Sequence, residues 1–276
     1  MSILVSLTPA ESKRLIGIAV VKHPIVQKAL QEGNILVSNG TTTGYFIEEA
    51  FDISLPLEKF PSGVITQGVL CQTPKDRIRS IFIQKGKLCE NNLDISDYDE
   101  LDTFWEKMSS GDVYIKGANA FDSLGNAGFL LAHPEGGNVM KALPKINAQN
   151  IKFIIPVGLE KLVMSVSEAQ KNMKGVYDYS YTFGRGCGYA TVCNGIIINE
   201  IVSIQMLTGA KAIQAAAGGV GGSEGSVVLV VEGTDVQESN TVKLLQHIKG
   251  ERALPVWKET CAECVFQCKY RFPIED

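Results

Sequence analysis

The sequence has no excess of positive charge and no long apolar run. Its 276 residues carry a formal net charge of −4, whereas nucleic-acid-binding domains usually carry a basic excess. No apolar segment reaches the roughly 18 residues that a membrane helix requires. The first residues have neither a basic lead nor a signal-length apolar stretch, which predicts a cytoplasmic protein. We therefore expect no nucleic-acid partner and no membrane partner.

Internal repeats, linkers and low-complexity segments are also missing. Apolar residues make up 45% of the chain and charged residues 20%, which is the balance of a protein with an ordinary core. The length suits one large domain or two modest ones. After residue 175 the sequence changes to an alternation of strand and helix patterns. This change predicts an α/β core in residues 1–175 and a second domain in residues 176–276.

Three short apolar segments each run into glycine and polar residues. Residues 113–115 lead to Lys116 and Gly117, residues 128–131 lead to His133, and residues 151–157 lead to Lys161. An open α/β sheet binds ligands at the carboxyl ends of its strands. We therefore predict a binding site made of these loops. Two lysines there favour an anion such as a phosphate or carboxylate, and the alternative is two solvated lysines.

A fourth strand is followed by a loop of glycines and threonines. The strand at residues 35–37 leads to the loop at residues 39–44, and residues 45–51 have helical spacing. Backbone N–H groups at a helix start, with hydroxyls beside them, form a cradle for an anion. An ordinary capped turn between strand and helix remains the alternative.

The last hundred residues alternate between strand and helix patterns. Strands are expected at residues 189–193, 211–217, 226–231 and 252–257, with helices at residues 196–207 and 236–248. This is the βαββαβ order of a ferredoxin-like fold. The glycine run at residues 218–225 lies between two strands, whereas a dinucleotide fingerprint lies between a strand and a helix. We interpret it as a hairpin loop that covers the site.

Seven cysteines are present, an odd number that in a cytosolic chain favours thiols or a metal site over disulfides. Cys261, Cys264 and Cys268 follow a C-x2-C-x3-C pattern and predict a zinc ion or an iron–sulfur cluster. Cys187 or Cys193 would supply the fourth ligand. In the alternative, these are reduced thiols on one face of a terminal helix.

Three segments resemble ribose-5-phosphate isomerase A. Residues 39–47, NGTTTGYFI, resemble its Gly-Thr-Gly-Ser-Thr loop and helix, and residues 112–122, DVYIKGANAFD, resemble its strand ending in Asp-Gly-Ala-Asp-Glu. Residues 153–163, FIIPVGLEKLV, resemble its late strand ending in lysine. The resemblance covers residues 34–163. It implies a Rossmann-like core of the superfamily that includes CoA transferases and sugar-phosphate deaminases, followed by a small α+β domain.

The sequence departs from the isomerase at its catalytic positions. Lys116 and Asn119 stand where the isomerase has aspartates, and residues 142–144 contain no carboxylate where it has its catalytic glutamate. An enediol isomerisation requires a base, so His133 and Glu135 become the candidate catalytic residues. CoA transferases use a glutamate nucleophile, but no pattern assigns that role to Glu135 or Glu160.

The sequence thus predicts a small-molecule-binding protein, an isomerase-like or transferase-like enzyme if it is catalytic. Its ligand would be a small phosphorylated or carboxylated metabolite, and a homo-oligomer is compatible with the sequence. The alternatives are a non-catalytic ligand sensor, and a metal or redox protein that uses the terminal cysteines. The predicted ligand-binding residues are Gly40, Thr41, Thr42, Thr43, Lys116, Gly117, Asn119, Gly136, Gly137 and Lys161. The alternative for Asn119 is to cap a turn, which is the role expected of Asp122.

Overall fold

The computed structural model describes residues 2–89, 98–264 and 268. In chain order its strands and helices are β1 (Ser2–Leu7), α1 (Pro9–Lys22), α2 (Pro24–Glu32), β2 (Asn34–Val37), α3 (Thr41–Phe51), η1 (Leu57–Lys59), β3 (Gly63–Thr66), β4 (Val69–Gln72), β5 (Ile81–Gln84), β6 (Lys87–Leu88), α4 (Tyr98–Lys107), β7 (Val113–Ile115), β8 (Ala120–Phe121), β9 (Ala127–Leu131), α5 (Gly137–Gln149), β10 (Lys152–Pro156), η3 (Leu159–Lys161), α6 (Val166–Asn172), β11 (Gly188–Val192), β12 (Ile196–Ile198), α7 (Glu200–Thr208), β13 (Lys211–Gly218), β14 (Ser226–Glu232) and α8 (Asp235–Ile248).

The main sheet has six strands in the order β12-β10-β7-β2-β5-β6. The first four are parallel, while β5 and β6 continue the sheet with antiparallel pairings. The chain is therefore a mixed α/β protein, as expected. Because β2, β7, β10 and β12 run in the same direction, the loops that follow them emerge at one edge of the sheet, called here the carboxyl edge.

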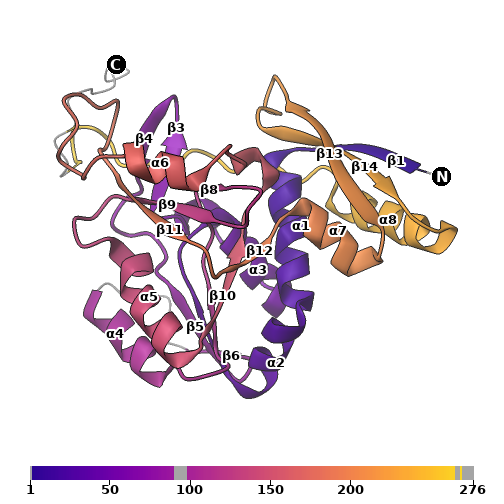
Figure 1. Ribbon diagram of the computed structural model, residues 1–276, viewed down its shortest axis with the longest axis horizontal. Coiled ribbons are helices and arrows are strands. Elements are labelled where there is room, and N and C mark those ends of the chain that lie inside the picture. The colour runs from indigo at the N-terminus through magenta and orange to yellow at the C-terminus, as the bar shows by residue number, and fades with distance from the viewer. Residues whose placement is uncertain (1, 90–97, 265–267, 269–276) are drawn as a thin grey trace.

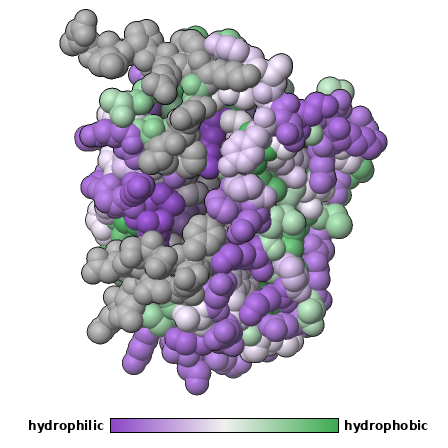
Figure 2. Space-filling view, turned by 90° about the vertical axis from the view of Figure 1, so that its left-hand side faces the viewer, coloured by the Kyte–Doolittle hydropathy of each residue, from purple (hydrophilic) through white to green (hydrophobic). Residues whose placement is uncertain are grey.

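Helices cover both faces of this sheet (Figure 1). Helices α1, α2 and α3 lie on one side, and α4 and α5 on the other. Strand β7 shows why: Val113 and Ile115 belong to one buried cluster, while Tyr114 belongs to the other. A central strand buried on both faces has no polar face, so its run is apolar throughout. On the side shown in Figure 2, the outer surface is mostly hydrophilic with small hydrophobic areas between.

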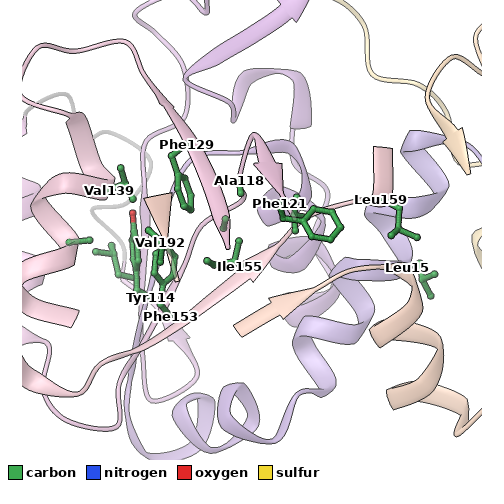
Figure 3. Close-up of a cluster of buried hydrophobic side chains, with 14 of the residues drawn as sticks. Leu15, Tyr114, Ala118, Phe121, Phe129, Val139, Phe153, Ile155, Leu159 and Val192 are labelled. Carbon is green, nitrogen blue, oxygen red and sulfur yellow. The ribbon is translucent and has the colours of Figure 1, made fainter. Parts of the chain in front are cut away.

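A second, antiparallel sheet has the order β1-β14-β13. Helix α7 packs against α1, β13 and α8. The two sheets share one hydrophobic cluster, which runs from Tyr114 and Phe153 through Phe121 and Leu159 to Leu15 (Figure 3). The boundary predicted at residue 175 stays a prediction. Strand pairings cross it in both directions, since β1 joins β14 and β12 joins β10.

The predicted βαββαβ arrangement does not form one sheet. Strand β11 pairs with β9, and β12 pairs with β10 in the main sheet. The expected helix at residues 196–207 is in fact strand β12 followed by α7, which begins after the Asn199 cap. The expected strand at residues 252–257 was wrong, because these residues have no regular secondary structure. Strand β1 occupies the β14 edge instead, with six paired positions from Ser2 to Leu7.

Some local features follow from the neighbouring residues. Thr8 and Glu11 form a reciprocal capping box at the start of α1, through N–H···O bonds of 3.3 and 2.9 Å. The glycine run is the connection between β13 and β14. Across the residues with assigned positions, no helix combines the length and apolar character needed to cross a membrane.

Candidate functional site

The loops at the carboxyl edge lie side by side. The N–H of Ser38, after β2, donates to the carbonyl of Ile115 at 2.8 Å. The N–H of Lys116, after β7, donates to Ile154 at 3.2 Å, and that of Val157, after β10, donates to Ile198 at 3.0 Å. These bonds continue the parallel ladder by one residue on each strand. Residues 38–41, 116–119, 157–161 and 199–200 therefore begin at the same edge.

The glycine–threonine loop leads directly into α3. Gly40 is the N-cap and offers no side chain to cap the helix, so the first N–H groups remain available to water or an anion. Thr43 is buried, and its hydroxyl is 2.8 Å from the carbonyls of both Ser38 and Gly40. That hydroxyl stabilises the turn. Thr41 is half-buried at the helix start, and Thr42 is buried.

The start of α5 reaches the same edge. The Asn138 amide donates to the Ser38 hydroxyl at 3.3 Å and to the Ser80 hydroxyl at 3.4 Å. Gly136 and Gly137 have positive φ angles of 79° and 58°. A Cβ on Gly136 would overlap the Met140 side chain. Glycine is therefore required where the chain turns into α5.

The two predicted catalytic residues are exposed. Nδ1 of His133 accepts the N–H of Glu135 at 3.2 Å. His133 lines a separate cavity of about 420 Å³, together with Pro134 and residues of the 170–178 segment. The two side chains thus share one short turn, and His133 faces a different hollow from the groups described next.

Lys116 is half-buried at the end of the central strand β7. No described residue supplies a hydrogen-bond or ion-pair partner for its ammonium group. Burial lowers the pKa of Lys116 to about 8. Neighbouring Gly117 lies close to β10, since a Cβ there would be 3.4 Å from the Pro156 carbonyl. A lysine kept near water but without a carboxylate is suited to binding an anion or to reacting as a free amine.

Asn119 and Asp122 have structural partners. The Asn119 side-chain oxygen accepts the N–H of Leu130 at 3.0 Å, which favours the cap over the ligand contact. The Asp122 carboxylate accepts from the N–H groups of Leu124, Asn126 and Val166 at 3.0–3.1 Å. The pKa of Asp122 is lowered, because these hydrogen bonds outweigh the opposing effect of burial. The expected capping role of Asp122 is confirmed.

Lys161 lies on the neighbouring loop, in η3. Its Nζ donates to the Ala118 carbonyl at 3.3 Å, so it connects the loops after β10 and β7. Burial lowers the pKa of Lys161, and nearby Lys13 of α1 lowers it further, against an opposing effect of Glu160 and Glu200. Two cationic side chains thus stand on adjacent loops of the carboxyl edge.

Two carboxylates at this edge were missed as a pair. Oε1 of Glu200 and Oε2 of Glu160 lie 3.2 and 3.3 Å from the position that a Cβ on Gly158 would occupy. Both oxygens are buried without a hydrogen-bond partner among the described residues. Glu200 is fully buried, and its other oxygen accepts the N–H of Leu159 at 2.8 Å. Burial raises the pKa of Glu200 to about 7, and the nearby Glu160 adds to this rise.

The glycine hairpin meets the same corner. A Cβ on Gly225 would be 3.2 Å from Pro9 and 3.8 Å from the Cβ of Glu160. The base of the β13–β14 loop thus lies beside the start of α1 and beside η3. Chemically, this edge combines two amines of reduced basicity with two carboxyl groups, one of which can exchange a proton near neutral pH.

The predicted metal ligands lie elsewhere. Cys261, Cys264 and Cys268 line a cavity of about 30 Å³ together with Cys71 of β4. Neither Cys187 nor Cys193 lines it, and Cys193 is exposed. In the described part of the chain, no three His, Cys, Asp or Glu side chains are already arranged to hold a metal ion.

The sequence matches no protein-family model, and a comparison with curated proteins finds no significant relative.

Proposed function

We propose that the protein is an enzyme acting on a small phosphorylated or carboxylated metabolite, in the manner of an isomerase or a transferase. The proposal rests on Lys116 and Lys161, two half-buried lysines on adjacent loops of the carboxyl edge. Burying an ammonium group without an acidic partner is costly. For Lys116, whose pKa is shifted by burial alone, a bound phosphate or carboxylate would supply the missing partner through charge-assisted hydrogen bonds.

The arrangement of the sheet supports kinship with the ribose-5-phosphate isomerase A and CoA transferase superfamily. Four parallel strands in the order β12-β10-β7-β2 are compatible with a Rossmann-like core that binds its ligand at their carboxyl ends. The glycine–threonine loop and the Lys116 and Lys161 loops, on which the resemblance was based, all follow these strands. Kinship would explain why the ligand groups come from distant parts of the chain.

Three side chains are candidates for moving a proton or attacking the substrate. His133 and Glu135 are exposed on their turn. Glu160 is the third, because its Oε2 atom is buried without a partner beside Lys161. Glu200 is too deeply buried to touch a substrate in this conformation, and we assign it the positioning of η3 through the Leu159 N–H.

Ligand binding is tested by thermal unfolding with sugar phosphates, acyl-CoAs and small carboxylates. A bound ligand raises the melting temperature with increasing concentration. We expect a shift in the native protein and in Lys243→Met, which changes an exposed lysine on α8. The shift should disappear in Lys116→Met. A full shift in Lys116→Met would contradict the proposed site.

Turnover of the ligand found in this way separates an enzyme from a sensor. We expect Glu160→Gln to reduce kcat by about 10²-fold or more, the usual contribution of an acid–base group. Glu135→Gln and His133→Ala, measured in parallel, test the two residues predicted from sequence. A ligand that binds in every variant but is never converted would favour the non-catalytic sensor.

A further inference from the structure

Four of the seven cysteines gather around one small cavity. Cys71 lies on β4, and Cys261, Cys264 and Cys268 lie nearly two hundred residues later. All four are half-buried, and none of them is joined in a disulfide. The cavity they line measures about 30 Å³, enough for one or two water-sized particles. The three cysteines of the C-x2-C-x3-C pattern thus lie beside a fourth cysteine from a distant strand.

Backbone hydrogen bonds join the chain segments around this cavity. The N–H of Glu259 donates to the Gln72 carbonyl at 3.0 Å, which brings the terminal segment beside β4. The N–H of Arg185 donates to the Leu70 carbonyl at 2.9 Å on the same strand. Gly184, with φ of 84°, lies so close to Leu70 that a Cβ would overlap its carbonyl. Three chain segments therefore meet at the thiols.

Two cations stand beside the thiols. The Arg185 guanidinium lines the cavity and donates to Gln72 and Ala132. Lys258 lies within electrostatic reach of Cys71 but does not line the cavity. A zinc ion bound by four thiolates carries two net negative charges. The two cations would offset part of that charge, although the Glu259 carboxylate also lines the cavity.

We propose that Cys71, Cys261, Cys264 and Cys268, which are not already arranged to hold an ion, move together around a single structural zinc ion. Spacings of two and three residues within the terminal segment agree with zinc-ligand pairs, and four thiolates complete the tetrahedral shell of a closed site. The size of the cavity favours one ion over an iron–sulfur cluster, which would require it to open. The zinc ion would attach the terminal segment to the β3–β4 hairpin.

The test begins with the metal content of the full chain, purified without oxygen and without added metal. We expect about one zinc per chain in the native protein and in Cys193→Ser, which changes the exposed cysteine outside the cavity. Cys71→Ser should lose at least nine-tenths of the zinc. Circular dichroism of Cys71→Ser confirms that the variant is folded.

Thiol alkylation followed by mass spectrometry gives a readout that does not depend on a variant. With zinc bound, the four thiols should resist alkylation while Cys193 reacts. After removal of zinc by a chelator, all four should react at least tenfold faster. Equal reactivity before and after chelation would overturn the proposal, as would full zinc content in Cys71→Ser.

Two other outcomes also count against it. Iron with inorganic sulfide in the native protein would replace the single ion by a cluster. Native protein that contains no metal, and takes up none when the reduced chain is given zinc, would show four unliganded thiols. None of these results bears on Lys116, so the zinc proposal and the proposed enzymatic function fail independently.

Discussion

Two regions of the molecule treat buried charge in opposite ways. On α1, the Arg14 guanidinium forms ion pairs with Glu48, Glu49 and Glu251 at 2.8–2.9 Å and lies 4.4 Å from the centre of the Tyr45 ring. At the carboxyl edge, the described residues offer no partner to the Lys116 ammonium group, and Oε1 of Glu200 is equally unpaired.

Arg14 belongs to a structural network, whereas Lys116 and Glu200 belong to the candidate site. Arg14 joins α1 to α3 and to the segment after α8. Its Nε, Nη1 and Nη2 atoms each donate a hydrogen bond to one of the three carboxylates. Unpaired buried groups cost stability, and proteins retain such costs mainly where function requires them. Removing charge should therefore destabilise the first region and stabilise the second.

The largest effect is expected for Arg14→Met. Three carboxylates whose side chains are only 11–25% exposed would be left around an apolar group. Removing one member of such a network typically costs about 3–5 kcal/mol. Urea unfolding at pH 7 measures the loss, with Lys28→Met on the exposed face of α2 as the control. A loss below about 1 kcal/mol would mean that the network contributes little.

Glu200→Gln should change how stability depends on pH. The folded state holds the Glu200 proton up to about pH 7, while the unfolded chain releases it near its ordinary value of 4.5. Native stability therefore falls as pH rises between these values, by about 3 kcal/mol for this group. Glutamine cannot ionise, so the variant should lack this fall and be the more stable protein at pH 8.

Urea midpoints at pH 5 and pH 8 measure this difference. Glu32→Gln, an exposed substitution at the end of α2, should keep the pH dependence of the native protein. Identical slopes in Glu200→Gln and the native protein would show that Glu200 is charged in the fold.

The smallest and opposite effect is expected for Lys116→Met. Below pH 8 both the folded and the unfolded state carry the ammonium charge, so its burial cost is fully present at pH 7. Replacing it with an apolar group of similar length should stabilise the protein by about 1–3 kcal/mol at pH 7. The gain should shrink as pH rises from 8 towards 10.5.

Urea unfolding at pH 7 and pH 9.5 tests both the stabilisation by Lys116→Met and its decrease at higher pH. A destabilised Lys116→Met would indicate that the ammonium group has a favourable environment in the fold, and it would remove the contrast with Arg14.

Local features were predictable where neighbouring residues determine them. The Thr8–Glu11 capping box and the Asp122 turn involve side chains two to four residues from their partners. The loops of the candidate site were predicted because each follows an apolar strand. The sequence predicts a helix at residues 196–198 where the structure has a strand, because a short isoleucine run has the same apolar pattern in a buried helix and in a buried strand.

The missed features depend on distant contacts. In the sequence, nothing distinguishes Glu200 from any other first residue of a helix. Its burial follows from its position beside Gly158 in the fold. Cys71 has no cysteine neighbour in sequence, so the spacing pattern could not include it. Residues 252–257 have strand-like composition, but β1 already occupies the available edge of β14.

The pairing of β1 with β14 also has a consequence for how the chain is made. Ser2 pairs with Glu232 and Leu7 with Val227, so the first strand leaves the ribosome more than two hundred residues before its partner exists. At about 5–20 residues per second, the delay is roughly 10–45 s. Throughout that interval a nascent strand with open hydrogen-bonding groups must be kept from pairing with neighbouring chains. This sheet therefore assembles late in synthesis, and a slow-translating stretch between α1 and β13 would prolong the vulnerable period.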